Sequence, residues 1–303
     1  DRFTFLGSGN SRTSYVFVTK KEVGLNTVKK LQGASRIRIG TQSVGHTVYI
    51  VSRVFSYLLG LQDPKFVTGY SGTEIDLALL RGEVDARANI PDTVVQRSPH
   101  WIEKQLVDFH VVLEIPKGFR MRHPAFERQP ALEKFAKTDK ERQILEMFRA
   151  FRIIGSPFII SPGVPKQRVE VLKEVFRNIF KDPKFAKTFR KLTGADASPL
   201  TPEEQEKTIR NIPRDPEIIA LFKKIASAGP LPSRCSRGRA GRDKSVTSRN
   251  KWNEAPRAYT RGIINFFGGI HRSNSSSFAL RAMEDPSNAF IPGLTPAVFC
   301  VGG

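Results

Sequence analysis

Short apolar segments alternate along the chain with longer segments in which apolar residues recur every three or four positions. The short segments are typical of strands and the longer ones of amphipathic helices. Strands are predicted at 14–19, 36–40, 65–68, 84–88, 108–113 and 157–160. Strands that alternate with helices indicate an α/β fold, and connections of this kind favour a parallel sheet.

The helical segments are bounded by recognisable start and stop residues. Helices are predicted at 47–59, 73–81, 141–151, 166–181 and 183–192. Gly60 and Gly82 supply C-terminal stops, while Thr201 and Asp215 are expected to open two further helices as N-caps. The part of the chain that leads up to residue 230 is therefore expected to be mostly helical. Residues 116–130 are expected to form a surface loop.

Helical and strand periodicity both fail after Pro230. The segment 233–242 is rich in Arg and Gly, and 273–277 is almost entirely serine. Such composition does not supply the apolar faces that a packed core requires. Residues 231–303 are therefore predicted to form an irregular or disordered tail.

The charge of the chain favours an anionic partner. Lys and Arg number 49 against 29 Asp and Glu, which gives +20, and the excess is +13 over residues 1–230 and +7 over the tail. Nucleic acid, a membrane surface and small carboxylates all suit this charge. No apolar run approaches the roughly 20 residues that span a bilayer. Charge alone does not decide among the partners.

The sequence offers little for catalysis or metal binding. The two cysteines, Cys235 and Cys300, both lie in the tail, so residues 1–230 have no thiolate ligand or nucleophile. The five histidines share no metal-ligand spacing, and neither a serine-nucleophile elbow nor a nucleotide P-loop is present. We therefore expect no catalytic residues, no metal and no cofactor, and a protein that is not an enzyme.

Two glycine-rich loops are candidate anion sites, because each joins a predicted strand to a predicted helix. The first, 40–47, combines glycines and hydroxyl groups with the free amides of a helix N-terminus, which bind carboxylates or phosphates. The second, 71–74, repeats this arrangement, so two helix N-termini could face one crevice at the carboxyl edge of the sheet.

A structural interpretation of each loop remains open. Ser43 and Thr47 could serve only to cap the first helix, which is the commonest role of such residues. His46 could donate to an anion or could be an exposed bystander. In the second loop, Thr73 with Asp76 fits a loosened capping box.

Taken together, four segments resemble one known family. They are 38–47 (RIGTQSVGHT), 67–74 (VTGYSGTE), 81–85 (RGEVD) and 155–165 (GSPFIISPGVP). Their order and spacing, from about residue 3 to 228, are similar to those of the solute receptors of tripartite tricarboxylate transporters. The resemblance implies a periplasmic-binding-protein type two-lobe α/β fold, type II-like, that closes on a small carboxylated solute without covalent chemistry.

The resemblance also implies site residues, partners and a location. The implied ligand-binding residues are Ser43, Gly45, His46, Thr47, Gly72, Thr73, Asp85 and Asn89, the last standing where many family members have a second aspartate. The implied partners are a small carboxylate and the membrane components of a tripartite tricarboxylate transporter. Nucleic acid is not expected as a partner. The protein is expected to be a monomer in the periplasm or in another extracytoplasmic compartment.

The expected domain organisation follows from the same resemblance. Residues 1–33 would be a remnant of the first lobe, 34–150 the second lobe, 151–230 a return to the first lobe, and 231–303 the tail. Family members begin with a signal peptide and a strand–helix segment that carries an Ala-Gly-Gly loop, and neither is present in this sequence. The chain is thus expected to be N-terminally truncated, with one lobe incomplete.

A competing hypothesis comes from the basic tail. A protein that binds nucleic acid through the Arg-rich segment 233–242 would also explain the charge of +20. Its affinity would fall steeply as salt is added. The two glycine loops favour the carboxylate receptor over this alternative.

Overall fold

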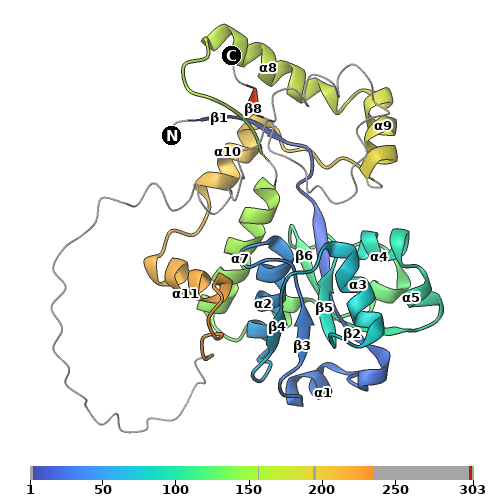
Figure 1. The fold of residues 1–303 in the computed structure, drawn as a ribbon. Coiled ribbons are helices and arrows are strands. Elements are labelled where there is room, and N and C mark those ends of the chain that lie inside the picture. Colours follow the sequence, from blue (N-terminus) through green and yellow to red (C-terminus); the bar gives the residue numbers. More distant parts are fainter. Residues whose placement is uncertain (1–2, 156, 194–195, 235–299, 302–303) are drawn as a thin grey trace, which may run out of the picture. The chain divides into compact units, whose positions relative to one another are not determined.

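The computed structural model describes residues 3–155, 157–193, 196–234 and 300–301 (Figure 1). The chain divides into two units, Asp1–Pro232 with Thr295–Gly303, and Ser233–Leu294. The helices and strands described below belong to the first unit. Most of the predicted tail, and with it the hypothesis of nucleic-acid binding, lies outside the described residues.

The described part of the chain is a mixed α/β structure, as predicted. Its strands are β1 (Thr4–Ser8), β2 (Thr13–Lys20), β3 (Arg38–Gly40), β4 (Lys65–Val67), β5 (Ala86–Asn89), β6 (Val107–Ile115), β7 (Pro157–Ile160) and β8 (Cys300–Val301). Its α-helices are α1 (Val28–Gly33), α2 (Thr47–Leu59), α3 (Gly72–Arg81), α4 (Pro91–Arg97), α5 (His100–Glu103), α6 (Pro124–Glu127), α7 (Asp139–Ile154), α8 (Lys166–Ile179), α9 (Pro183–Thr193), α10 (Pro202–Arg210) and α11 (Pro216–Ala226). Two 3₁₀ turns, η1 (Lys21–Val23) and η2 (Leu132–Phe135), complete the set.

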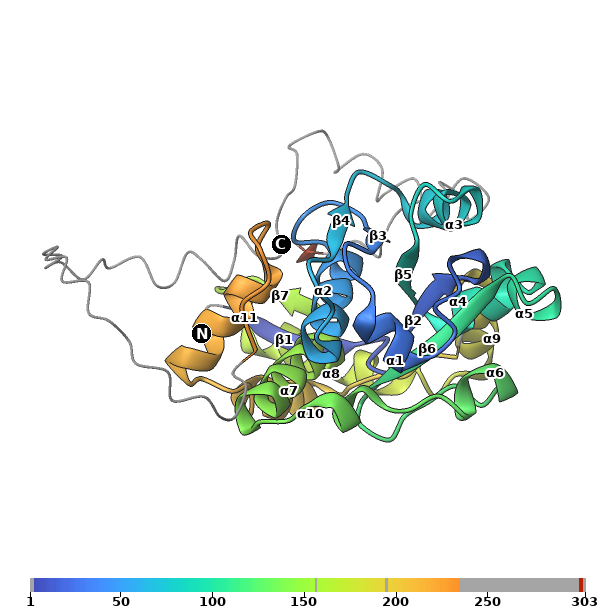
Figure 2. The same ribbon diagram turned by 90° about the horizontal axis from the view of Figure 1, so that it is seen from below.

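The strands form two sheets, as a two-lobe α/β fold requires. One has the order β1-β7-β8 and the other the order β4-β3-β5-β2-β6, whose strands are labelled in Figures 1 and 2. The prediction of a parallel sheet is correct for β4, β3 and β5 but wrong for β2, which is antiparallel to both β5 and β6. The apolar pattern of β2 marks a buried strand but does not set its direction relative to its neighbours.

The strand pairing also differs from the expected division of the chain. β2 lies within residues 1–33, which were assigned to the first lobe, yet it pairs with β5 and β6 of the second. Sequence periodicity identifies a strand but carries no information about its partners. Residues 13–20 therefore belong with the five-stranded sheet.

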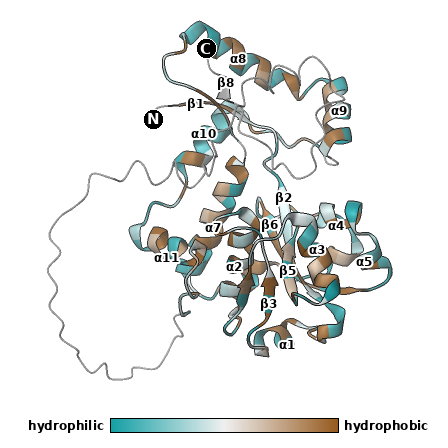
Figure 3. Ribbon diagram, viewed as in Figure 1, coloured by the Kyte–Doolittle hydropathy of each residue, from teal (hydrophilic) through white to brown (hydrophobic). Residues whose placement is uncertain are grey.

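Helices cover both faces of the five-stranded sheet, and alternate residues of β2 face the two sides. Tyr15 and Phe17 belong to one core cluster, together with residues of α2, α7 and α11, whereas Val16 and Val18 belong to a second, together with residues of α3, α4 and α5. Figure 3 shows the apolar and polar sides of these helices. A strand buried on both faces explains the continuous apolar run of residues 15–18.

Arg53 fastens α11 to α2 inside the first of these clusters. It is almost fully buried, and its guanidinium donates to the carbonyl oxygens of Ile225 and, at 2.8 Å, Gly229. The cation also lies 4.8 Å from the ring centroid of Phe66. Because the carbonyl of Ile225 lies in the last turn of α11, the positive charge also complements the C-terminal end of the helix dipole.

The smaller sheet is built on β1 and β7, which pair antiparallel with an irregularity between Phe5 and Gly7. Gly7 has a φ of +124°, and a Cβ there would lie 2.3 Å from the carbonyl oxygen of Leu200, so glycine is required. Leu6, Ile160 and Phe176 form its core. None of the helices in the described ranges is long and apolar enough to span a bilayer.

Candidate functional site

The two glycine-rich loops meet at one edge of the five-stranded sheet. One loop connects β3 to α2 and the other connects β4 to α3, and β3 and β4 are parallel neighbours. The amide and hydroxyl of Thr41 both donate to the carbonyl oxygen of Val67, at 2.8 and 3.2 Å, which ties the beginnings of the two loops together. The predicted arrangement of two helix N-termini at the carboxyl edge is therefore present.

The two helices leave this edge on opposite faces of the sheet. α2 packs in the cluster that contains Ile39 and Phe17, and α3 packs in the cluster that contains Val16 and Val18. In the sheet order β4-β3-β5, the chain passes from β3 through α2 to β4 on one side, and then through α3 to β5 on the other side of β3. The order of the strands therefore reverses between β3 and β5. Ligands of open α/β sheets bind at such a point, outside the carboxyl ends of the strands.

The N-terminus of α2 is capped by a histidine, which corrects the prediction that Ser43 and Thr47 cap this helix. His46 is the N-cap, and its Nδ1 accepts a hydrogen bond from the amide of Val48 at 3.2 Å. Burial, and secondarily the charge of Arg152, lowers the pKa of His46, so the ring is neutral at physiological pH. With Nδ1 accepting, the proton is on Nε2, which remains as a donor.

The loop before α2 is accessible and free of negative charge. Ser43 and Gly45 are exposed, whereas His46 and Thr47 are half-buried. The first turn of α2 contains no acidic residue. Since the first amides of a helix lack partners within the helix, this N-terminus combines free donors with a positive dipole end.

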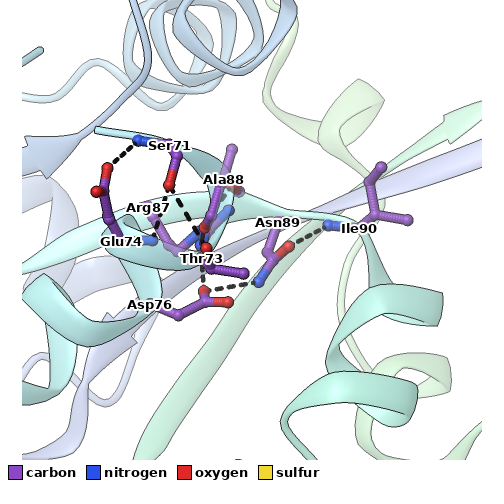
Figure 4. Close-up of polar contacts among 9 residues, drawn as sticks. Ser71, Thr73, Glu74, Asp76, Arg87, Ala88, Asn89 and Ile90 are labelled. Carbon is purple, nitrogen blue, oxygen red and sulfur yellow. Dashed lines mark hydrogen bonds and ion pairs between the residues drawn. The ribbon is translucent and has the colours of Figure 1, made fainter. Parts of the chain in front are cut away.

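The N-terminus of α3 has the opposite electrostatic character. Ser71 and Glu74 form a capping box, in which Glu74 accepts from the amide of Ser71 at 2.6 Å (Figure 4). The predicted pairing of Thr73 with Asp76 is wrong, because the cap lies two residues earlier. Hydrogen bonds from Ser71 lower the pKa of Glu74, so a carboxylate sits beside the exposed Gly72 and Thr73.

A buried ion pair connects α3 to β5, and the side chain of Asn89 is hydrogen-bonded to it. Arg87 donates to Asp76 and, at 2.9 Å, to the carbonyl oxygen of Gly72. Asn89 donates to Asp76 at 3.3 Å, and its own oxygen accepts from the amide of Ile90 at 2.9 Å. Figure 4 shows this network. Asn89 therefore lies at the predicted edge, but both ends of its amide are used within the fold.

Asp85 lies at the other edge of the sheet. It immediately precedes β5, whereas the two loops follow the carboxyl ends of β3 and β4, and about four residues of strand, roughly 13 Å, separate it from Asn89. Arg38 binds it through its backbone amide at 2.8 Å and through its guanidinium at 2.6 Å. The Arg38 hydrogen bonds outweigh burial and lower the pKa of Asp85. The structure gives Asp85 a role in joining β3 to β5, away from the other predicted site residues.

No residue of α7 is among the predicted site residues, yet Arg152 of that helix lies at the same edge of the sheet as the two loops. Its Cζ is 5.8 Å from the ring centroid of Tyr15. A signal was available, because Arg152 follows Phe148 by four positions and Leu145 by seven, which places a charge on the apolar face of the helix. Within the described ranges, no group of three or more His, Cys, Asp and Glu side chains could hold a metal ion.

No family model and no curated protein matches the sequence. Several solved structures of solute-binding proteins are similar to the chain. They include a TctC solute-binding protein from Polaromonas, at 15% identity over 74% of this chain and 68% of that one with a TM-score of 0.47.

Two further structures are similar to the same extent. The periplasmic binding protein BugD is 19% identical over 74% of this chain and 70% of its own, with a TM-score of 0.47. MatC from Rhodopseudomonas palustris, solved with bound malate, is 15% identical with the same coverages and a TM-score of 0.45. The three structures share with this chain a mixed α/β fold, and one of them is a TctC solute-binding protein, the kind of protein that the sequence motifs resemble.

Proposed function

We propose that the chain is a receptor for a small carboxylate, which binds at the N-terminus of α2. The observation that carries this proposal is the loop 41–46, which is exposed at residues 43–45, lies at the carboxyl edge of the sheet and leads into a helix whose first turn has no acid. A helix N-terminus of this kind favours an anion through its free amides and its dipole. Ser43, Gly45, His46 and Thr47 are the proposed contacts.

The charges around the two loops favour the α2 loop over the α3 loop as the site of a carboxylate. At α3 a carboxylate solute would meet the charged Glu74 of the capping box, whereas at α2 it would meet the neutral His46 with Nε2 as a donor. Like charges at such short range repel. Gly72 and Thr73 are therefore proposed as the distal wall of the site, with α2 as the anchor, and Asp85 is left out.

The wider role is proposed from the sequence resemblance. A receptor of this kind would act outside the cytoplasm as a monomer and would close on its solute. It would pass the solute to the membrane components of a tripartite tricarboxylate transporter, with no cofactor and no covalent step. The basic charge of residues 1–230 would favour an anionic solute without specifying which one.

Calorimetric titration of the full chain tests the proposal. The panel is malate, succinate, adipate and citrate, with succinamide as a neutral analogue. We expect saturable binding of at least one carboxylate and none of succinamide. Absence of binding across the panel, or equal binding of succinamide, would contradict the proposal.

A negative charge placed in the first turn of α2 should weaken carboxylate binding without lowering the stability of the fold. Thr47→Glu is expected to keep or raise the melting temperature, because an acid in a first turn stabilises a helix by about 0.3–1 kcal/mol. The same charge should weaken carboxylate binding by about tenfold or more, since it lies where the solute charge would be.

Gln167→Glu is the matched control for this variant. It adds the same charge to the first turn of α8, which also lacks an acidic residue there. Titration of both variants with the tightest-binding carboxylate of the panel is the measurement. Equal affinities of Thr47→Glu and Gln167→Glu would rule out the α2 anchor.

A further inference from the structure

Arg152 is a cation in the last turn of α7, a helix with one face packed into the core. Ile144, Leu145 and Phe148 of α7 are buried in the cluster that also contains most of α2. Arg152 is half-buried, and its Nε is shielded from solvent without a hydrogen-bond partner in the described part of the chain. An arginine in this position has a donor that the fold does not satisfy.

The topology places this guanidinium beside the N-terminus of α2. β2 runs antiparallel to β5 with Val16 opposite Asn89, so Tyr15 lies at the carboxyl edge of β5. The side chain of Tyr15 belongs to the cluster on the α2 face, and Arg152 lies over its ring. Arg152 and the loop before α2 therefore share one edge and one face of the sheet.

The surroundings of Arg152 do not neutralise its charge. Arg149, one turn earlier, is paired with Glu133 and Glu146, whereas Arg152 has no carboxylate partner among the described residues. Its near neighbours are Tyr15, whose pKa is raised by burial, and His46, whose pKa is lowered. Both are uncharged at neutral pH, so a guanidinium and the positive end of α2 lie together without an anion between them.

We propose that Arg152 binds a carboxylate group of the solute, at the point where the guanidinium and the first turn of α2 converge. This inference rests on the proposed function and adds a charged side chain to a site otherwise made of amides and neutral donors. A guanidinium recognises both oxygens of a carboxylate in one plane. Arg152 would thus select a charged carboxylate over its neutral amide.

The test uses the full chain and the carboxylate panel named above. Arg152→Gln keeps the length and polarity of the side chain but removes the charge, and we expect it to weaken carboxylate binding by about 10- to 100-fold. Arg152→Lys, which keeps the charge but loses the planar fork, should fall between. Arg142→Gln is the control, because Arg142 is an exposed residue of the same helix, and it should bind within about twofold of the wild type.

A second measurement on the unaltered protein keeps the inference testable if Arg152→Gln folds poorly. The Nε–H resonance of Arg152, buried in the free protein, should shift downfield when malate or another binding carboxylate is added. Unchanged binding by Arg152→Gln, or a fixed Nε–H resonance while the α2 amides respond, would overturn the role of Arg152 alone. Absence of binding by the wild type would overturn the proposed function and this inference with it.

Discussion

Replacing Asp76 with alanine is expected to lower the free energy of unfolding by about 3–5 kcal/mol. Arg87 is only 4% exposed, and Asp76 is its ion-pair partner. Without that partner, the cation would be buried with only the Gly72 carbonyl and its own strand as acceptors, and Asn89 would lose a contact. Urea unfolding of the wild type and Asp76→Ala measures the difference.

A double variant serves as the control for the buried pair. Asp76→Leu with Arg87→Met replaces both charges by apolar side chains of similar size, and exchanges of this kind are often neutral or stabilising. The double variant should therefore be more stable than Asp76→Ala. If Asp76→Ala unfolds within about 1 kcal/mol of the wild type, the pair does not hold α3 against β5 as described.

The second large effect is a loss of stability in acid caused by His110. Its side chain is 2% exposed, its Nε2 lies 2.7 Å from the hydroxyl of Thr19, and burial lowers its pKa to about 4 although Asp108 opposes this shift. In the unfolded chain the pKa is about 6.5, so the unfolded state binds the extra proton first. The stability contributed by neutral His110 is complete above about pH 6.5 and falls by about 3 kcal/mol as the pH drops to 4.

Comparison with His110→Gln isolates this contribution from the carboxylates that also titrate in acid. The variant should be less stable than the wild type at pH 7, and the difference should narrow steadily between pH 6.5 and 4. Urea unfolding at intervals across this range provides the measurement. A difference that stays constant with pH would show that His110 does not titrate with a depressed pKa.

The segments with strong local signals were predictable from the sequence. The bounds of α2 were predicted correctly, because apolar periodicity defines the helix and Gly60 ends it in the left-handed conformation. Thr201 and Asp215 are N-caps as expected. These features depend on residues within one or two turns, so the sequence contains all the information that they require.

Features that depend on distant partners were not predictable. The antiparallel pairing of β2 brings residues 13–20 to strands some 70 and 90 positions later, and no local pattern encodes that choice. The helix caps show a subtler limit. Ser43 and Thr47 have suitable side chains for capping α2, but the loop geometry gives the role to His46.

The two strand-to-helix loops were predictable, but the charges around them were not. Glycines and hydroxyl groups next to helix starts indicated where both loops lie, whereas the salt bridge of Asp85 with Arg38 depends on which strands are neighbours. The same limitation hid Arg152, since its proximity to the α2 loop follows from the direction of β2. Local sequence therefore indicates where the loops lie, whereas the arrangement of the strands determines which charged residues surround them.

Backbone amide NMR of the ¹⁵N-labelled full chain, titrated with malate, succinate, adipate or citrate, would locate the carboxylate site residue by residue. Binding at the N-terminus of α2 predicts that the largest and saturable shifts occur at the amides of residues 43–48, with smaller shifts at 72 and 73. Saturable shifts confined to residues outside the α2 loop, or a spectrum unchanged by every carboxylate, would contradict it.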